Sequence, residues 1–311
     1  MSISSLSARK RWDLVLSLLT LACLCLSLWV PIEGWVAWTW LGSLMLLTGI
    51  PHGATDHLLY WQHQRSQGKS PNWKSFLIQY LLQIILYALL WWWLPGLSLV
   101  LFLLFSFYHF GQSELYYLDL PESSWLKKSL YLLWGGLIMG IILLSQPAET
   151  LPYLEAMLPS GLLEIEMWRG WYLPICLSLG GMWLGGMGWI WLKGKINTSS
   201  LLWEVGISLL LALALHVSTL WIAFGLYFGI WHATKSIRTE IAYLPAEINL
   251  SRWIRAAWPF TLLSLVGLGL LVGAWFLWGQ NLHPVLLFFA GISVLTLPHM
   301  SVLEHVYRGV K

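Results

Sequence analysis

The chain alternates long apolar runs with short polar breaks along its whole length. A helix needs about 20 residues to cross the hydrocarbon core of a bilayer, so we divided the apolar runs at charged or Pro/Gly-rich breaks. The predicted spans are residues 13–31, 36–60, 75–93, 97–118, 128–145, 171–192, 200–216, 219–236, 256–278 and 283–307. The boundary between the seventh and eighth spans is the least clearly marked. The pattern predicts an all-α, polytopic integral membrane protein with about ten transmembrane helices.

The positions of Lys and Arg test this count, because loops that face the cytoplasm carry an excess of both. Ten spans place the two ends of the chain on one side of the membrane. That side then holds 16 of the 17 basic residues, in short loop clusters, and leaves only Arg169 on the other. We therefore expect both termini in the cytoplasm and a multi-pass protein of the cell inner membrane.

Composition limits the function classes. Hydrophobic residues make up 58% of the 311 residues and charged residues only 10%, against about 25% charged in an average soluble domain. No polar block is long enough to fold separately, so residues 1–311 are predicted to form a single transmembrane domain. The net charge of +3 lies in loop clusters without interleaved aromatics, which argues against nucleic-acid binding.

Four of the nine histidines lie deep inside predicted spans. His52, His109, His232 and His299 are about 16, 12, 13 and 16 residues from the outer end of their spans. At 1.5 Å per residue these positions are roughly 18 to 24 Å deep, so the four imidazoles share one level. A single buried histidine is more often a core residue than a ligand. Four at one level would each need a buried partner, so we expect a shared metal ion.

Imidazole is a ligand for iron, copper, zinc and nickel, so ligand type alone does not choose the metal. Four neutral ligands leave a divalent ion positively charged, with coordination positions free, which suits O2 at Fe(II). Polar neighbours fit a supporting shell that orients the rings. These are Asp56, Ser113, Glu114, Ser236 and Glu304. Pro51 and Pro298 each precede a candidate ligand and favour bent helices around a pocket.

Four motifs around these histidines carry a family resemblance. They are GIPHGATDH at 49–57, FSFYHFG at 105–111, YFGIWH at 227–232 and LPHM at 297–300. The chain resembles the Brp/Blh family of membrane-bound β-carotene 15,15′-dioxygenases. The resemblance implies an Fe(II) enzyme that splits the central double bond of β-carotene with O2 into two all-trans retinal molecules, usually for a microbial rhodopsin. It carries iron ligation onto His52, His109 and His232.

One position departs from the family pattern. The family has a second histidine four residues after the position that matches His232, and here that residue is Ser236. Either His299 completes the iron site, or the chain has lost or altered the activity. We favour His299, which the depth argument selects independently. Asp56, His57, Ser236 and Glu304 are predicted to support the site, and His57 becomes a ligand if the bend at Pro51 turns it inward.

The bilayer suits an apolar polyene substrate, and aromatics beside the ligands are candidates to clamp it. These are Phe107, Tyr108, Phe228 and Trp231. Two other readings stay open. A transmembrane b-type haem protein would use pairs of these histidines as axial ligands for electron transfer. A carotenoid- or retinal-binding or transport protein would use the buried His and Asp56 without cleavage.

Overall fold

A computed structural model describes residues 3–29, 34–155, 165–278 and 284–309. Every regular element in this part of the chain is helical. The elements are α1 (Ile3–Trp29), α2 (Gly34–Leu44), η1 (Met45–Gly49), α3 (Ile50–Gly53), α4 (Asp56–Ser66), α5 (Trp73–Trp93), α6 (Pro95–Leu115), α7 (Trp125–Leu144), α8 (Pro147–Glu155), α9 (Ile165–Leu192), α10 (Thr198–Val217), α11 (Leu220–Phe224), η2 (Gly225–His232), α12 (Ala233–Tyr243), α13 (Leu250–Trp278) and α14 (Pro284–Gly309).

Seven helices are long and apolar enough to cross a membrane, among the described residues. They are Arg9–Trp29, Trp73–Trp93, Pro95–Leu115, Trp125–Leu144, Ile165–Leu192, Thr198–Val217 and Leu250–Gly273. These helices make the chain a multi-pass membrane protein. The expected count of about ten is not confirmed. The second, eighth and tenth predicted spans correspond to α2–α4, α11–α12 and α14, which are not among the seven.

Two of these three stretches are interrupted by π-helical turns. Residues 34–53 run as α2, η1 and α3, and residues 220–243 run as α11, η2 and α12. Pro51 has no backbone N–H to continue an α-helical ladder. Just before it, the Ile50 N–H bonds to the Met45 carbonyl five residues back, as in a π-helix. Single π-turns inside helices often mark functional sites, and both of these turns lie next to or include a deep histidine.

The two interrupted stretches pack directly against each other. A Cβ on Gly229 would lie 2.6 Å from the Leu44 Cβ, and one on Gly225 would lie 2.6 Å from the Trp40 Nε1. Only glycine permits so close an approach. The Thr48 hydroxyl also donates a 2.8 Å hydrogen bond to the Gly229 carbonyl. These contacts hold the His52 segment against the His232 segment.

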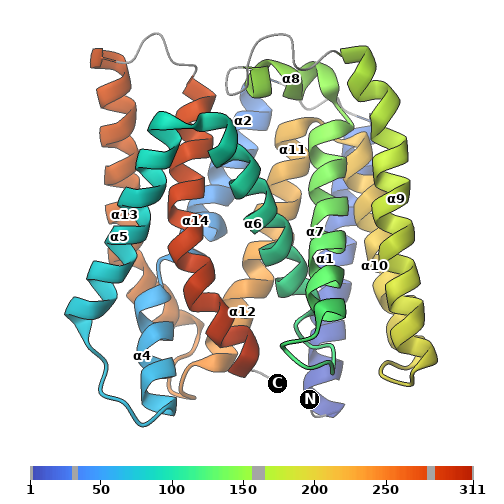
Figure 1. The fold of residues 1–311 in the computed structure, drawn as a ribbon, viewed down its shortest axis with the longest axis horizontal. Helices are drawn as coiled ribbons and strands as arrows, with labels where there is room; N and C mark the ends of the chain where they lie inside the picture. The colour runs from blue at the N-terminus through green and yellow to red at the C-terminus, as the bar shows by residue number, and fades with distance from the viewer. Residues whose placement is uncertain (1–2, 30–33, 156–164, 279–283, 310–311) are drawn as a thin grey trace.

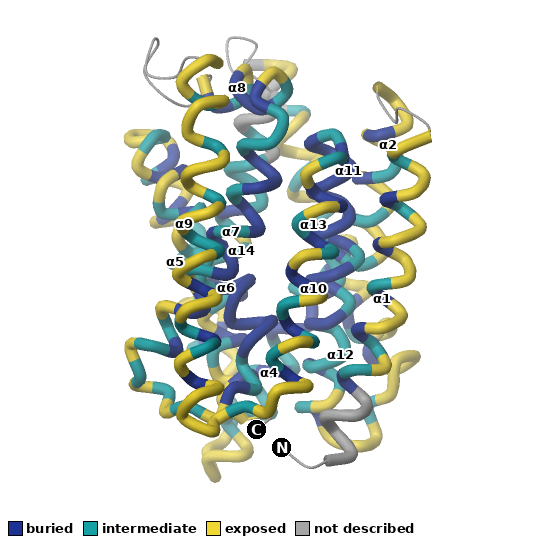
Figure 2. Tube along the Cα trace, turned by 90° about the vertical axis from the view of Figure 1, so that its right-hand side faces the viewer, coloured by how far each residue is buried: buried dark blue, intermediate teal, exposed yellow. Residues whose placement is uncertain are grey.

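The other two histidines lie on longer helices of the same bundle. A Cβ on Gly111 of α6 would lie 1.8 Å from the Tyr131 carbonyl oxygen of α7, so glycine is what lets α6 lie flat on α7. On its other side, α6 packs against α5 and α14. Figure 2 shows buried residues facing the interior of this bundle and exposed residues along its outer faces. Long apolar side chains on those outer faces fit a lipid environment.

α1 begins and α14 ends at the same end of the bundle (Figure 1). This fits an even number of crossings, while the side of the membrane stays a prediction. The expectation that the basic residues near this end form loop clusters is wrong for three of them. Arg9, Lys127 and Lys235 are 9%, 1% and 8% exposed and lie on helices among packed neighbours. Each is close to a carboxylate, which offsets the cost of burying its charge.

Candidate metal centre

The four deep histidines come together from four different elements. Their ring centroids are 4.7 Å apart for His52 and His299, 4.8 Å for His109 and His232, 5.4 Å for His52 and His232, and 5.5 Å for His109 and His299. All four pairs meet edge to face, at interplanar angles of 74–90°. Each of the four residues is at most 5% exposed. We call this set the histidine group.

Local backbone structure turns each ring inward. His52 follows Pro51 and the η1 turn, and His232 is the last residue of η2. Pro298, inside α14, removes one backbone hydrogen bond immediately before His299. His109 lies on the regular helix α6, where Gly111 brings the backbone against α7. Three of the four rings therefore lie at helix irregularities that the sequence encodes.

Hydrogen bonds on the Nδ1 atoms select one tautomer in three of the rings. The His52 Nδ1–H donates to the Gly49 carbonyl, because a carbonyl can only accept. The His299 Nδ1–H donates to the Asp56 Oδ1 at 2.7 Å. These bonds leave the lone pair on Nε2, which is the arrangement found in metal-binding histidines.

His232 follows the same rule through Ser113. The Ser113 hydroxyl donates to the Phe110 carbonyl at 2.9 Å, so its oxygen is left to accept from the His232 Nδ1–H at 3.1 Å. The Nε2 atoms of His232 and His299 are buried and have no hydrogen-bond partner in the described structure. His109 lacks a partner on both ring nitrogens. Unpaired buried polar atoms are costly. A ligand that bound these nitrogens would remove that cost.

Ring spacing provides a test of whether a metal ion fits. An imidazole nitrogen lies about 2.1 Å from a bound transition metal, which puts the ring centroid about 3.2 Å away and ligands at 90–109° about 4.5–5.2 Å apart. Two of the four observed distances, 4.7 and 4.8 Å, lie within that range, and the other two, 5.4 and 5.5 Å, are slightly longer. The side chains are nevertheless not arranged as finished ligands. Within the described residues, no three His, Cys, Asp or Glu side chains form a metal-holding group. The donor set fits a metal after small ring movements, and ligation stays a proposal.

The other predicted site residues lie in different places. Asp56 is 2% exposed and bridges the His299 Nδ1 and the Tyr80 hydroxyl, which donates to its Oδ2 at 2.9 Å. Ser236 is buried, but its hydroxyl is 3.3 Å from that of Tyr307 and bonds to no imidazole. Asp56 therefore touches the histidine group directly, and Ser236 does not.

His57 and Glu304 also lie outside the histidine group. The His57 ring is 4.3 Å from the ring of Phe260 on α13, so the bend at Pro51 turns it away from the other imidazoles. Glu304 accepts a hydrogen bond from the Gln112 amide and pairs with Arg308 at 2.6 Å. Gln112 lies on the same helix as His109, three residues later, so any influence of Glu304 on His109 is indirect.

Only one of the four aromatics suggested by the sequence lies beside the imidazoles. The Phe228 ring is 5.7 Å from both His52 and His232. Phe110, which the sequence did not single out, is closer to His232 at 4.7 Å. Tyr108 packs on Tyr131 of α7 instead.

An apolar cavity continues from these rings away from the polar end of the site. Phe224 stacks on Phe228 at 5.4 Å and lines a cavity of about 20 Å³ together with Phe102, Met139 and Phe289. Its lining is entirely apolar. The volume is small, so a bulky ligand enters only when these side chains move apart.

The structure also reveals buried polar residues that the sequence reasoning missed. Glu240 is 0% exposed and accepts hydrogen bonds from the Thr55 hydroxyl at 2.8 Å and the Trp253 Nε1 at 3.2 Å. Thr55 precedes Asp56, so this network supports the helix turn that carries the His299 partner. Hydropathy gave no signal, because Glu240 follows a predicted span as an ordinary loop charge would.

Comparisons with known proteins identify the family of the chain. The family model for β-carotene 15,15′-dioxygenase matches residues 43–307, which include all four histidines. A relative from uncultured marine bacterium 66A03, named β-carotene 15,15′-dioxygenase, is 35% identical over 72 residues. That alignment covers 23% of this chain and only 26% of the relative. No solved structure matches the chain significantly. The chain belongs to the β-carotene 15,15′-dioxygenase family.

Proposed function

We propose that this chain is an iron-dependent dioxygenase that cleaves β-carotene at its central double bond with O2 and releases two molecules of all-trans retinal. The family membership supports a carotenoid-cleaving enzyme. One structural observation carries the more specific proposal. Four buried imidazoles form a ring in which each has two neighbours with centroids within 5.5 Å, and three of them have unpaired nitrogens, in a helix bundle that fits a membrane.

Fe²⁺ would be held by the Nε2 atoms of His52, His232 and His299 and by one nitrogen of His109. His299 then takes the place of the family histidine that is Ser236 here. Bound iron would supply O2 activation, with the histidines tuning its reactivity. The overall reaction balances with one O2, because the broken double bond leaves two carbons that each become an aldehyde.

The chain's own residues would bind and orient the substrate. β-Carotene is soluble only in the hydrocarbon of the bilayer, so entry between helices spares it a transfer into water. Phe110 and Phe228 lie beside the imidazoles and offer flat apolar faces to a polyene. The apolar cavity lined by Phe224 and Phe289 extends this surface. Positioning of the central bond at the histidine group would set the bond that is cleaved.

The contacts favour this reading over the two others. A haem needs its two axial imidazoles on opposite faces of a wide porphyrin plane, whereas these four rings meet edge to face. A binding or transport protein has no need of four imidazoles gathered in one buried group. We expect the protein in the cell inner membrane, with a microbial rhodopsin as a consumer of retinal.

The test is expression in bacterial cells that produce β-carotene, followed by pigment extraction and measurement of iron in the purified chain. The native chain is expected to remove colour, to yield retinal and to carry iron. His52→Ala and His299→Ala are expected to lose both iron and retinal. His216→Ala is the matched control, because His216 lies in the last turn of α10, where its exposed ring pairs with the Tyr172 hydroxyl and not with the histidine group.

Two results would contradict the proposed reaction, and a third would contradict only the proposed ligand set. A Soret band in the purified chain would indicate haem. A chain that folds and binds carotenoid without cleavage, and without iron, would indicate a binding or transport role. Full activity of His299→Ala would remove His299 from the ligand set and leave the family reaction in place.

A further inference from the structure

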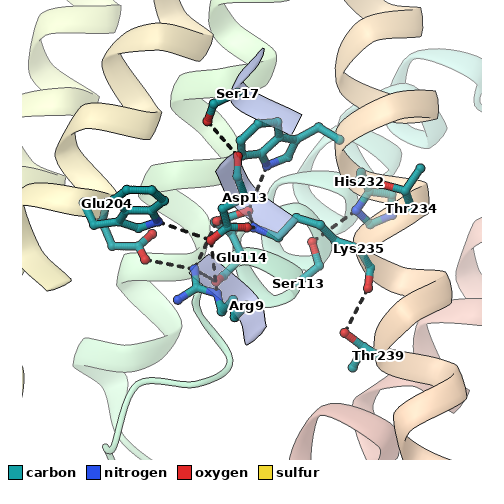
Figure 3. Close-up of polar contacts among 12 residues, drawn as sticks. Arg9, Asp13, Ser17, Ser113, Glu114, Glu204, His232, Thr234, Lys235 and Thr239 are labelled. Atoms are coloured by element: carbon teal, nitrogen blue, oxygen red, sulfur yellow. Dashed lines mark hydrogen bonds and ion pairs between the residues drawn. The ribbon is translucent and has the colours of Figure 1, made fainter. Parts of the chain in front are cut away.

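Five charged side chains lie buried together beside the histidine group (Figure 3). Arg9, Asp13, Glu114, Glu204 and Lys235 come from α1, α6, α10 and α12, and none is more than 9% exposed. We call them the ion cluster. Ionisable groups inside membrane helices are costly and usually have a function. The proposed cleavage reaction uses none of them directly.

Glu114 is the centre of the cluster. Its two oxygens lie 2.7 and 2.8 Å from the Lys235 Nζ, and the Trp231 Nε1 donates to Oε2 at 3.1 Å. Arg9 reaches the same carboxylate at 3.2 Å. One carboxylate thus binds two residues of the η2–α12 stretch from its position on α6.

These contacts form a closed loop around His232. Trp231 precedes His232 and Lys235 follows it by three residues, and both bind Glu114. Ser113, the neighbour of Glu114, accepts the hydrogen bond from the His232 Nδ1 at 3.1 Å. The imidazole is therefore fixed through its own nitrogen and through the residues on both sides of it. His109 lies on the same helix as Ser113 and Glu114, so the loop also fixes the 4.8 Å spacing between the two rings.

The first helix completes this arrangement. Asp13 lies 3.0 Å from the Lys235 Nζ, and Arg9 joins Glu114 to Glu204 of α10, which it meets at 2.9 Å. The family model begins to match only at residue 43, so α1 lies outside the matched region. A helix beyond the family match therefore supplies two members of the cluster.

We propose that the loop through Glu114, Lys235, Trp231 and Ser113, completed by Asp13 of α1, is a positioning device that holds the His232 imidazole with its Nε2 toward the other three rings. The effect of this positioning on metal binding rests on the proposed iron site. Buried ion pairs add little net stability compared with apolar packing, and conformational specificity is their better supported use. Glu204 lies in the cluster but outside this loop, since its cation contact is to Arg9.

The test compares two variants that remove the same charge, Glu114→Gln and Glu204→Gln. The full-length chain is purified in detergent without metal, and the His232 tautomer is read by ¹⁵N NMR of labelled histidine, assigned with His232→Ala. Co²⁺ binding is then titrated by visible absorption. We expect Glu114→Gln to shift the His232 signal and to weaken Co²⁺ binding about 10-fold or more, the loss typical of groups that orient metal ligands. Glu204→Gln is expected to leave the His232 signal in place and Co²⁺ affinity within about twofold.

Equal losses in the two variants would show that net charge matters and position does not, and would overturn the proposal. A lower melting temperature with an unchanged His232 signal would indicate a purely structural role and would also overturn it. If Glu114→Gln does not fold, Asp13→Asn gives the same test, because it removes the negative charge that α1 places beside Lys235 and leaves Glu114 intact. A native chain that binds no Co²⁺ contradicts the proposed iron site, while the tautomer comparison still decides the positioning role.

Discussion

His232 belongs to one group of buried polar residues and borders another. On one side are the three other imidazoles. The rings of His109, His232 and His299 together have four buried nitrogens with no hydrogen-bond partner in the described structure. On the other side is the ion cluster, where Glu114 and Lys235 meet opposite charges within 3.0 Å. The histidine group leaves several ring nitrogens without partners, whereas each of the five charged groups of the ion cluster has an opposite charge within 3.0 Å.

This difference indicates a separate role for each region. Opposite charges at these distances offset the cost of burying one another, so the ion cluster fits a role in holding helices. Unpaired buried nitrogens carry a cost that a ligand would remove. Function is therefore expected at the histidine group, and stability and positioning at the ion cluster.

The largest expected effect is loss of the reaction on substitution of His109. His109→Ala removes one imidazole whose nitrogens have no other partner, so the fold loses no hydrogen bond. We expect retinal formation to fall by at least about 100-fold, with iron lost from the purified chain. Pigment extraction and metal analysis measure both. Iron retained at the native level would show that His109 is not a ligand.

A substitution in the ion cluster is expected to lower stability more than a substitution in the histidine group does. Lys235→Met removes the nearer of the two cations that contact both Glu114 and Asp13 and leaves only Arg9 beside them. Breaking a buried ion pair costs about 3–5 kcal/mol. Thermal unfolding in detergent should show a clear fall in melting temperature, larger than that of His109→Ala. Adding Glu114→Gln to Lys235→Met should recover part of the loss. Equal melting temperatures for Lys235→Met and His109→Ala would contradict this comparison.

Asp56 supports a candidate ligand through a hydrogen bond and also carries a negative charge. Asp56→Asn keeps an oxygen that accepts from the His299 Nδ1–H but removes the negative charge, so iron affinity should fall about 10- to 100-fold. Tyr80→Phe, which removes only one neutral hydrogen bond to the same carboxylate, is the milder companion. Metal titrations of Asp56→Asn and Tyr80→Phe show which variant loses more iron affinity. An Asp56→Asn chain with native affinity would show that the His299–Asp56 contact does not tune the site.

The smallest effect is expected at Ser236. Its hydroxyl meets Tyr307 and bonds to no imidazole, so Ser236→Ala should change iron affinity by no more than about twofold. The same titration measures it. A loss of iron would show that the serine replaces the family histidine functionally, and would weaken the assignment of His299.

The four histidines could be predicted from sequence because imidazoles are conspicuous in apolar runs and because depth along a helix can be counted. Counting does not give rotation around the helix axis. His57 faces Phe260, and Trp231 faces Glu114, while Phe110 points at His232. The number of membrane spans was harder to predict, because π-turns interrupt the helical stretches that carry His52 and His232.

The ion cluster escaped prediction for a different physical reason. Arg9 and Lys235 lie close to the ends of apolar runs, where basic residues normally flank a membrane span. Whether such a charge is solvated or buried depends on neighbours more than 100 residues away, such as Glu114 for Arg9 and Asp13 for Lys235. One sequence without those contacts gives no means to tell the two apart.

The central claim is that His299 completes a four-imidazole iron site, and X-ray absorption of the iron-loaded chain tests it most directly. The native protein is expected to show four imidazole nitrogens at about 2.1 Å from iron, and His299→Ala is expected to show three with weakened binding. Three imidazoles in the native chain, unchanged in His299→Ala, would contradict the account.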